Sequence, residues 1–72
     1  MERQVVGSKG IHWVRYDEDS QVLEVEYESS GAYRYFDVPL DVYEWLMKAK
    51  SKGKFVNRLV KGHYRYEQIA DG

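Results

Sequence analysis

The chain has 72 residues, no cysteine and a formal net charge of −1. A chain of this length forms one small domain that buries only about 60% of the surface of its unfolded form, so its core needs large apolar side chains. Without cysteine it has neither a disulfide nor a thiolate ligand for a metal. No apolar run approaches the roughly 20 residues of a membrane span, and the N-terminus lacks the apolar region of a signal peptide. We therefore expect a soluble, cytoplasmic domain that does not enter a membrane.

The charges are divided unequally along the chain. Residues 1–44 hold ten acidic and four basic side chains, whereas the segment between Glu44 and Glu67 holds seven basic side chains and no acidic one. Such asymmetry bears on the binding partner rather than on the fold. A polyanion is the partner that the basic segment predicts.

Alternating apolar and polar residues predict three strands in the first half of the chain. Residues 1–7 carry little pattern, and we expect a flexible, irregular arm before a single domain over 8–69. The clearest alternation places Leu23, Val25 and Tyr27 on one face and acidic side chains on the other. Short turns join the predicted strands into an antiparallel meander. They span 11–16, 21–28 and 32–38.

Pro39 marks the change from strand to helix, because its fixed φ suits the first turn of a helix. Helical spacing then continues until Gly53. A buried stripe with i, i+3, i+4, i+7 spacing is predicted for this helix. It consists of Val42, Trp45, Leu46 and Ala49.

A second, shorter helix is predicted over 54–61. Phe55 and Leu59 stand four residues apart and define its apolar side. Ser51 is a candidate cap at its start. We expect Gly62 to end the helix in the left-handed conformation.

Residues 63–68 are predicted to form a short final strand or an extended tail docked on the sheet, and with the strand the element order is β-β-β-α-α-β. The fold class is therefore α+β. We expect a small single domain with an antiparallel sheet of three to four strands, covered on one face by two short helices.

Tyr33 and Tyr35 stand two residues apart on the third predicted strand and therefore share one of its faces. Exposed tyrosines can stack on nucleic-acid bases, whereas buried ones belong to the core. Both faces of this strand carry apolar residues, so both interpretations stay open. Tyr64 and Tyr66 pose the same choice in the final strand.

The basic segment is a candidate phosphate-binding surface. Lys54, Arg58 and Lys61 fall along one face of the predicted second helix. Such a row of cations can follow a phosphate backbone, and an ordinary solvated face is the alternative. The complete predicted site consists of Tyr33, Tyr35, Lys52, Lys54, Arg58, Lys61, Tyr64 and Arg65.

No motif for catalysis or metal binding stands out. His12 and His63 are the two histidines, and their spacing does not match that of metal-ligand pairs. The serines lie in turn-like contexts, where a nucleophile would lack a base and an orienting group. We therefore expect no enzymatic activity, no metal and no cofactor.

Three short motifs occur in an order and spacing that are typical of one family. They are G-A-Y-R-Y-F-D-V-P at 31–39, S-K-G-K-F-V-N-R at 51–58 and Y-R-Y at 64–66. Together they resemble the KTSC domain, over roughly residues 8–68. That domain is named for the C-terminus of some lysyl-tRNA synthetases and also occurs in small stand-alone proteins of bacteria and phages. The resemblance implies RNA binding, with tRNA as a candidate partner, and no established activity.

Two functions follow from these features. The first is a non-catalytic RNA-binding accessory domain that contacts phosphates through the basic helix and loop. The second is a protein-interaction module, including one for weak self-association. It would use the acidic face of Glu24, Glu26 and Glu28 or an exposed edge of the third strand.

Overall fold

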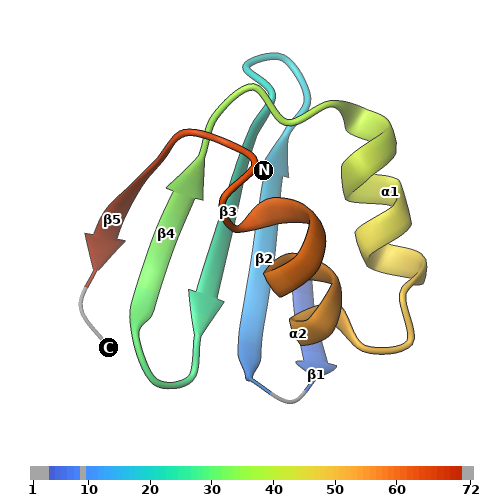
Figure 1. Ribbon diagram of the computed structural model, residues 1–72, viewed down its shortest axis with the longest axis vertical. Coiled ribbons are helices and arrows are strands. Elements are labelled where there is room, and N and C mark those ends of the chain that lie inside the picture. Colours follow the sequence, from blue (N-terminus) through green and yellow to red (C-terminus); the bar gives the residue numbers. More distant parts are fainter. Residues whose placement is uncertain (1–3, 9, 71–72) are drawn as a thin grey trace.

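Five antiparallel strands form one sheet in the order β1-β2-β3-β4-β5, and the helices cover one of its faces (Figure 1). The computed structural model describes residues 4–8 and 10–70. The strands are β1 Gln4–Ser8, β2 Ile11–Asp17, β3 Val22–Tyr27, β4 Gly31–Tyr35 and β5 Tyr66–Ala70. Between β4 and β5 lie α1 Leu40–Lys48, α2 Lys52–Phe55 and the π-helical segment η1 Val56–Val60. The predicted α+β class with helices on one face is confirmed, although the sheet has five strands rather than three or four.

β1 forms in a segment where the sequence shows little pattern. Val5 pairs with Trp13 on β2, and the register shifts between Val5 and Ser8. The side chain of Val5 is 86% exposed, so backbone pairing rather than burial of this residue defines the strand. The predicted irregular arm is therefore wrong for residues 4–7, and its residues 1–3 lie outside the described residues.

The helix-facing side of the central strands supplies most of the core. On β3, Leu23, Val25 and Tyr27 are buried, as the alternation predicts. Val14 on β2 stands opposite Val25, and Tyr16 stands opposite Leu23. The other buried apolar side chains are Ile11, Ala32, Tyr35, Val38, Leu46, Val56 and Val60.

β4 ends at Tyr35, earlier than predicted. Asp37 has a φ of 58°, a left-handed conformation that interrupts the strand. Val38 then turns back into the core. Its N–H donates to the carbonyl of Gln21 at 2.8 Å, and its carbonyl accepts from the Tyr16 hydroxyl at 2.6 Å. These two bonds hold the connection to α1 against the sheet.

α1 begins after Pro39, as predicted, and two residues of the predicted stripe, Val42 and Leu46, pack in or against the core. Leu46 is fully buried, whereas the side chain of Trp45 is 56% exposed. Tyr43 stacks on Tyr16 with the ring centroids 4.7 Å apart. Tyr43 and Leu46 together set the buried face of the helix, and Trp45 lies outside it. The predicted burial of Trp45 is therefore wrong.

The second helical segment covers 52–60 and changes type half-way. The Ser51 hydroxyl accepts a hydrogen bond from the N–H of Lys54 at 3.4 Å, so Ser51 caps α2 as predicted. At the end of η1, the N–H of Lys61 donates to the carbonyl of Val56 at 2.8 Å. This i→i−5 bond is the one that defines a π-helix.

Val56 and Val60 are the buried residues of η1, not Phe55 and Leu59 as predicted. Leu59 is 48% exposed and Phe55 is half-buried. Both pairs have the same four-residue spacing, so the apolar pattern alone does not choose between them. Gly62 follows with a φ of 80°, which confirms the predicted left-handed end. Among the described residues, no helix is long and apolar enough to cross a membrane.

β5 covers residues 66–70 rather than the predicted 63–68. Tyr66 stands opposite Tyr35, which fixes β5 beside β4. β4 therefore lies between β3 and β5 and has no free edge. The predicted exposed edge of the third strand is wrong, and the sheet edges are β1 and β5.

Two tyrosine hydroxyls meet inside the core. The Oη atoms of Tyr27 and Tyr35 lie 2.6 Å apart, and both residues are buried. Burial is the main cause that raises the pKa of each phenol above its ordinary value of 10.0. Both hydroxyls therefore keep their protons in the folded protein, and one donates to the other.

The hydroxyl pair predicts a non-additive mutational cycle. Tyr27→Phe or Tyr35→Phe alone leaves one buried hydroxyl without its partner, which lowers the free energy of unfolding by about 1–3 kcal/mol. The double variant removes both hydroxyls, so we expect it to lose less than the sum of the two single variants. Urea denaturation of the four proteins measures these differences. Additive losses would show that the hydroxyls do not interact.

The raised pKa values also predict loss of stability in alkali. The folded protein holds these protons more tightly than the unfolded chain, so their contribution is complete below pH 10.0. This stabilising contribution is lost as the pH rises above that value, because the phenols of the unfolded chain ionise at a lower pH than those of the folded protein. Urea denaturation at increasing pH should show a falling free energy of unfolding. The control is the Tyr27→Phe/Tyr35→Phe double variant, for which we expect a shallower fall; an identical fall would contradict the prediction.

Candidate nucleic-acid interface

Three tyrosines surround a hollow of about 370 Å³ on the helix-facing side of β4 and β5, here called the aromatic hollow. Tyr33 and Tyr35 point to this side because they alternate with Arg34 along β4. Tyr66 joins them from β5, with its ring centroid 5.8 Å from Tyr33 and 5.9 Å from Tyr35. The complete lining is Ser30, Tyr33, Tyr35, Lys61, Gly62 and Tyr66.

The three rings differ in how much of their surface meets solvent. Tyr35 is 2% exposed and forms the floor of the aromatic hollow, with its hydroxyl bonded to Tyr27. Tyr33 is half-buried and packs edge-on against Tyr27 at 5.5 Å. Tyr66 is 57% exposed and forms an open wall. Tyr35 therefore shapes the hollow, while Tyr33 and Tyr66 offer ring surface to a ligand.

A second hollow of about 310 Å³ adjoins the first and is here called the polar hollow. It shares Ser30 and Lys61 with the aromatic hollow, and the two together are called the groove. The Nζ atom of Lys61 lies 4.6 Å from the centre of the Tyr27 ring, a cation–π contact. The polar hollow is lined by Gly10, Ile11, Tyr27, Ser29, Ser30, Ser51, Gly53, Lys54, Asn57 and Lys61.

The groove brings together four of the eight predicted site residues, Tyr33, Tyr35, Lys54 and Lys61. Arg58 lines a different, shallow hollow beside Leu59, which Lys54 also borders. Lys54, Arg58 and Lys61 are exposed, and no ion pair found among the described residues involves them. Their charges therefore have no carboxylate partner in the described part of the chain.

The other predicted residues have structural contacts away from the groove. The ammonium of Lys52 donates to the carbonyl of Ala49 at 3.1 Å. Arg65 lies over the Phe36 ring at 4.6 Å. Tyr64 is half-buried and packs against the core.

The predicted site leaves out Tyr66 and Ser30, which both line the groove. Tyr66 belongs to the Y-R-Y motif, but its place beside Tyr35 depends on the register between β4 and β5. Ser30 reaches the groove because the β3–β4 turn lies beside Lys61. Both positions depend on pairings between residues far apart in the chain, so the local pattern carries no signal for them.

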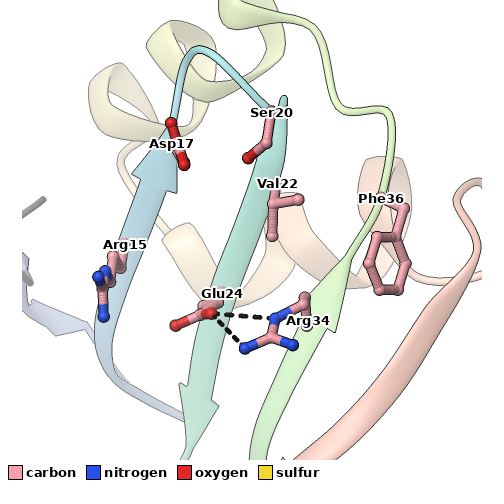
Figure 2. Close-up of a pocket in the computed structure, with 7 residues that line it drawn as sticks. All are labelled: Arg15, Asp17, Ser20, Val22, Glu24, Arg34 and Phe36. Atoms are coloured by element: carbon pink, nitrogen blue, oxygen red, sulfur yellow. Dashed lines mark hydrogen bonds and ion pairs between the residues drawn. The ribbon is translucent and has the colours of Figure 1, made fainter.

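The opposite face of the sheet carries an alternating row of charges (Figure 2). Arg15, Glu24, Arg34 and Glu67 stand opposite one another across β2, β3, β4 and β5. The guanidinium of Arg34 binds Glu24 at 3.0 Å and Glu67 at 3.0 Å. Figure 2 shows Arg34 reaching across to Glu24, at the side of a hollow that Phe36 also lines.

Two of the three glutamates of the predicted acidic face have a side-chain partner. Glu24 is bound by Arg34, and Glu26 lies 3.0 Å from Nδ1 of His12. Of the three predicted acids, Glu28 alone has no side-chain partner among the contacts found in the described residues. The described part of the chain also holds no group of three or more carboxylate or imidazole side chains that could bind a metal ion.

The KTSC domain model matches residues 7–64 of this chain. A lysine–tRNA ligase of Trichormus variabilis is 43% identical over 56 residues, which cover 78% of this chain and 10% of that protein. An uncharacterized protein of Stutzerimonas stutzeri is 40% identical over 70 residues, which cover 96% of this chain and 99% of that protein.

A similar fold has been solved. The crystal structure of a KTSC domain protein from Yersinia pestis has a TM-score of 0.92 and 35% identity, and the match covers 94% of this chain and 96% of that one. The chain spans only 10% of the length of the lysine–tRNA ligases that it matches. The match to the family model covers most of the chain, and the chain belongs to the KTSC domain family.

Proposed function

We propose that this domain is a non-catalytic accessory module that binds RNA through the groove. The observation that carries the proposal is the position of Lys54 and Lys61. Both line the polar hollow, and neither is paired with a carboxylate among the described residues. Cations of this kind attract a phosphate backbone and release its counterions. Arg58 extends the same charge beyond the groove.

The charge distribution supports a polyanionic ligand over an acidic-face interaction. Glu24 on β3 is paired with Arg34, while no ion pair found among the described residues involves the lysines of the groove. The similarity to lysine–tRNA ligases makes tRNA the RNA that we propose first. We also propose a cytoplasmic location, where such an RNA is available.

A second candidate function rests on the free edge of β5. All five residues of β5 are exposed, and its only described partner strand is β4. An unpaired edge can add a strand from another chain. Weak self-association through β5 is therefore the alternative. Light scattering at low and high salt measures it; a monomeric mass at every concentration would exclude self-association.

The RNA proposal predicts a salt-dependent loss of affinity in a double variant of the groove. Lys54→Ala/Lys61→Ala should weaken binding to a single-stranded RNA, because two phosphate contacts are lost. The slope of log K against log salt should fall in magnitude by about 1.4, or about 0.7 for each contact. Fluorescence anisotropy of a labelled oligonucleotide, titrated at several salt concentrations, measures both quantities.

Arg15→Ala/Lys48→Ala is the matched control. It removes the same number of positive charges, but neither residue lines the groove. We expect a smaller effect on affinity, through long-range attraction alone. Equal losses in the two double variants would show that net charge, and not the groove, holds the RNA.

A further inference from the structure

We propose that the groove holds one unpaired nucleotide of single-stranded RNA, with its base in the aromatic hollow and its phosphate in the polar hollow. The inference rests on the proposed function and adds the part of the RNA that is recognised. A surface that attracts phosphates only would take single strands and duplexes alike. The aromatic hollow is the feature that would make the domain bind single strands in preference to duplexes.

The aromatic hollow has the shape and the chemistry for a planar apolar ligand. The ring of Tyr66 is tilted by 49° from that of Tyr33 and by 41° from that of Tyr35. The rings therefore do not stack on one another, and Tyr66, which is 57% exposed, keeps ring surface open to the solvent. Every base has a π-face that can stack on such a ring.

Gly62 lines the aromatic hollow without adding a side chain to it. It lines the hollow with a φ of +80°, and a Cβ atom built there would meet nothing within 4 Å. The position that a side chain of residue 62 would take is therefore free of packed atoms. A base in the aromatic hollow would therefore meet no side chain from position 62.

The polar hollow supplies what a phosphate needs. Lys54 and Lys61 provide ammonium groups, while Ser29, Ser30 and Asn57 provide neutral donors. Because Ser30 and Lys61 line both hollows, the two sites adjoin. A base and the phosphate of its own nucleotide are likewise adjacent, so one nucleotide can occupy both.

A base in the aromatic hollow cannot at the same time be paired and stacked in a duplex. A paired base would have to leave its helix, which costs free energy that an unpaired base does not spend. The geometry therefore favours single strands, loops and ends over continuous duplex.

The test compares three RNA probes by fluorescence anisotropy at one salt concentration. They are a short oligo(A), its duplex with oligo(U), and an oligomer of the same length without bases. We expect the wild-type protein to bind oligo(A) more tightly than the duplex and the abasic oligomer. This comparison needs no variant, so it does not depend on any substituted protein folding.

Variants of Tyr66 then locate the base. Tyr66→Ala should weaken oligo(A) binding roughly 5- to 150-fold, the effect expected for one stacked base, and should leave abasic binding unchanged. Tyr66→Phe keeps the ring and should keep the affinity. Trp45→Ala is the matched control, because Trp45 is similarly exposed at 56% but lines neither hollow.

The outcomes separate this inference from the proposed function. If Lys54→Ala/Lys61→Ala weakens binding while Tyr66→Ala binds oligo(A) like the wild type, the base site is overturned and RNA binding stands. Equal wild-type affinity for oligo(A) and the abasic oligomer overturns the base site in the same way. Absence of binding to all three probes overturns both.

Discussion

The register of β4 against its two neighbours decides which side chains meet on both faces of the sheet. Tyr35 stands opposite Leu23 on β3 and opposite Tyr66 on β5. On the helix-facing side, this alignment gathers the tyrosines of the aromatic hollow. On the other side, the same alignment places Arg34 between Glu24 and Glu67. A slip of β4 by one residue would move Tyr33, Arg34 and Tyr35 each to the opposite face of the sheet.

The helical segment after α1 supplies the charged side of the groove. Its buried residues, Val56 and Val60, anchor it on the sheet. The π-type bond from Lys61 to Val56 ends the segment where the Lys61 ammonium lies over the Tyr27 ring. Lys54 and Asn57 of the same segment line the polar hollow. Buried residues and groove-lining residues therefore alternate within a few positions of the chain.

Much of the fold could be predicted from local pattern, and the site only in part. The alternation of β3, the helix start at Pro39 and the turn at Gly62 are local features, and the structure confirms them. Strand β1 carries no such pattern. It is defined by its pairing with β2, which the local sequence does not reveal. The predicted burial of Trp45 on α1 is wrong, because helical spacing is compatible with more than one apolar face.

For the candidate site, the distribution of charges along the chain singled out the lysines. It gave no information on which side chains lie around each of them. Lys54 and Lys61 reach the groove, whereas Lys52 is held by a carbonyl at the end of α1. The tyrosines were ambiguous because burial depends on which face of β4 meets the helices. Tyr66 required the β4–β5 register, which involves residues some thirty positions apart and which no local motif records.

The place of Tyr66 on an edge strand ties the groove to local unfolding. β5 is held by pairing with a single described strand, and its five residues are exposed, so it belongs to the parts of a domain that open at low free-energy cost. Each opening would move Tyr66 away from Tyr33 and remove one wall of the aromatic hollow. A ligand that binds only the closed strand would stabilise it by a free energy that rises with the logarithm of the ligand concentration above its Kd. Occupancy of the groove and protection of the β5 amides against hydrogen exchange would then be two measures of one equilibrium.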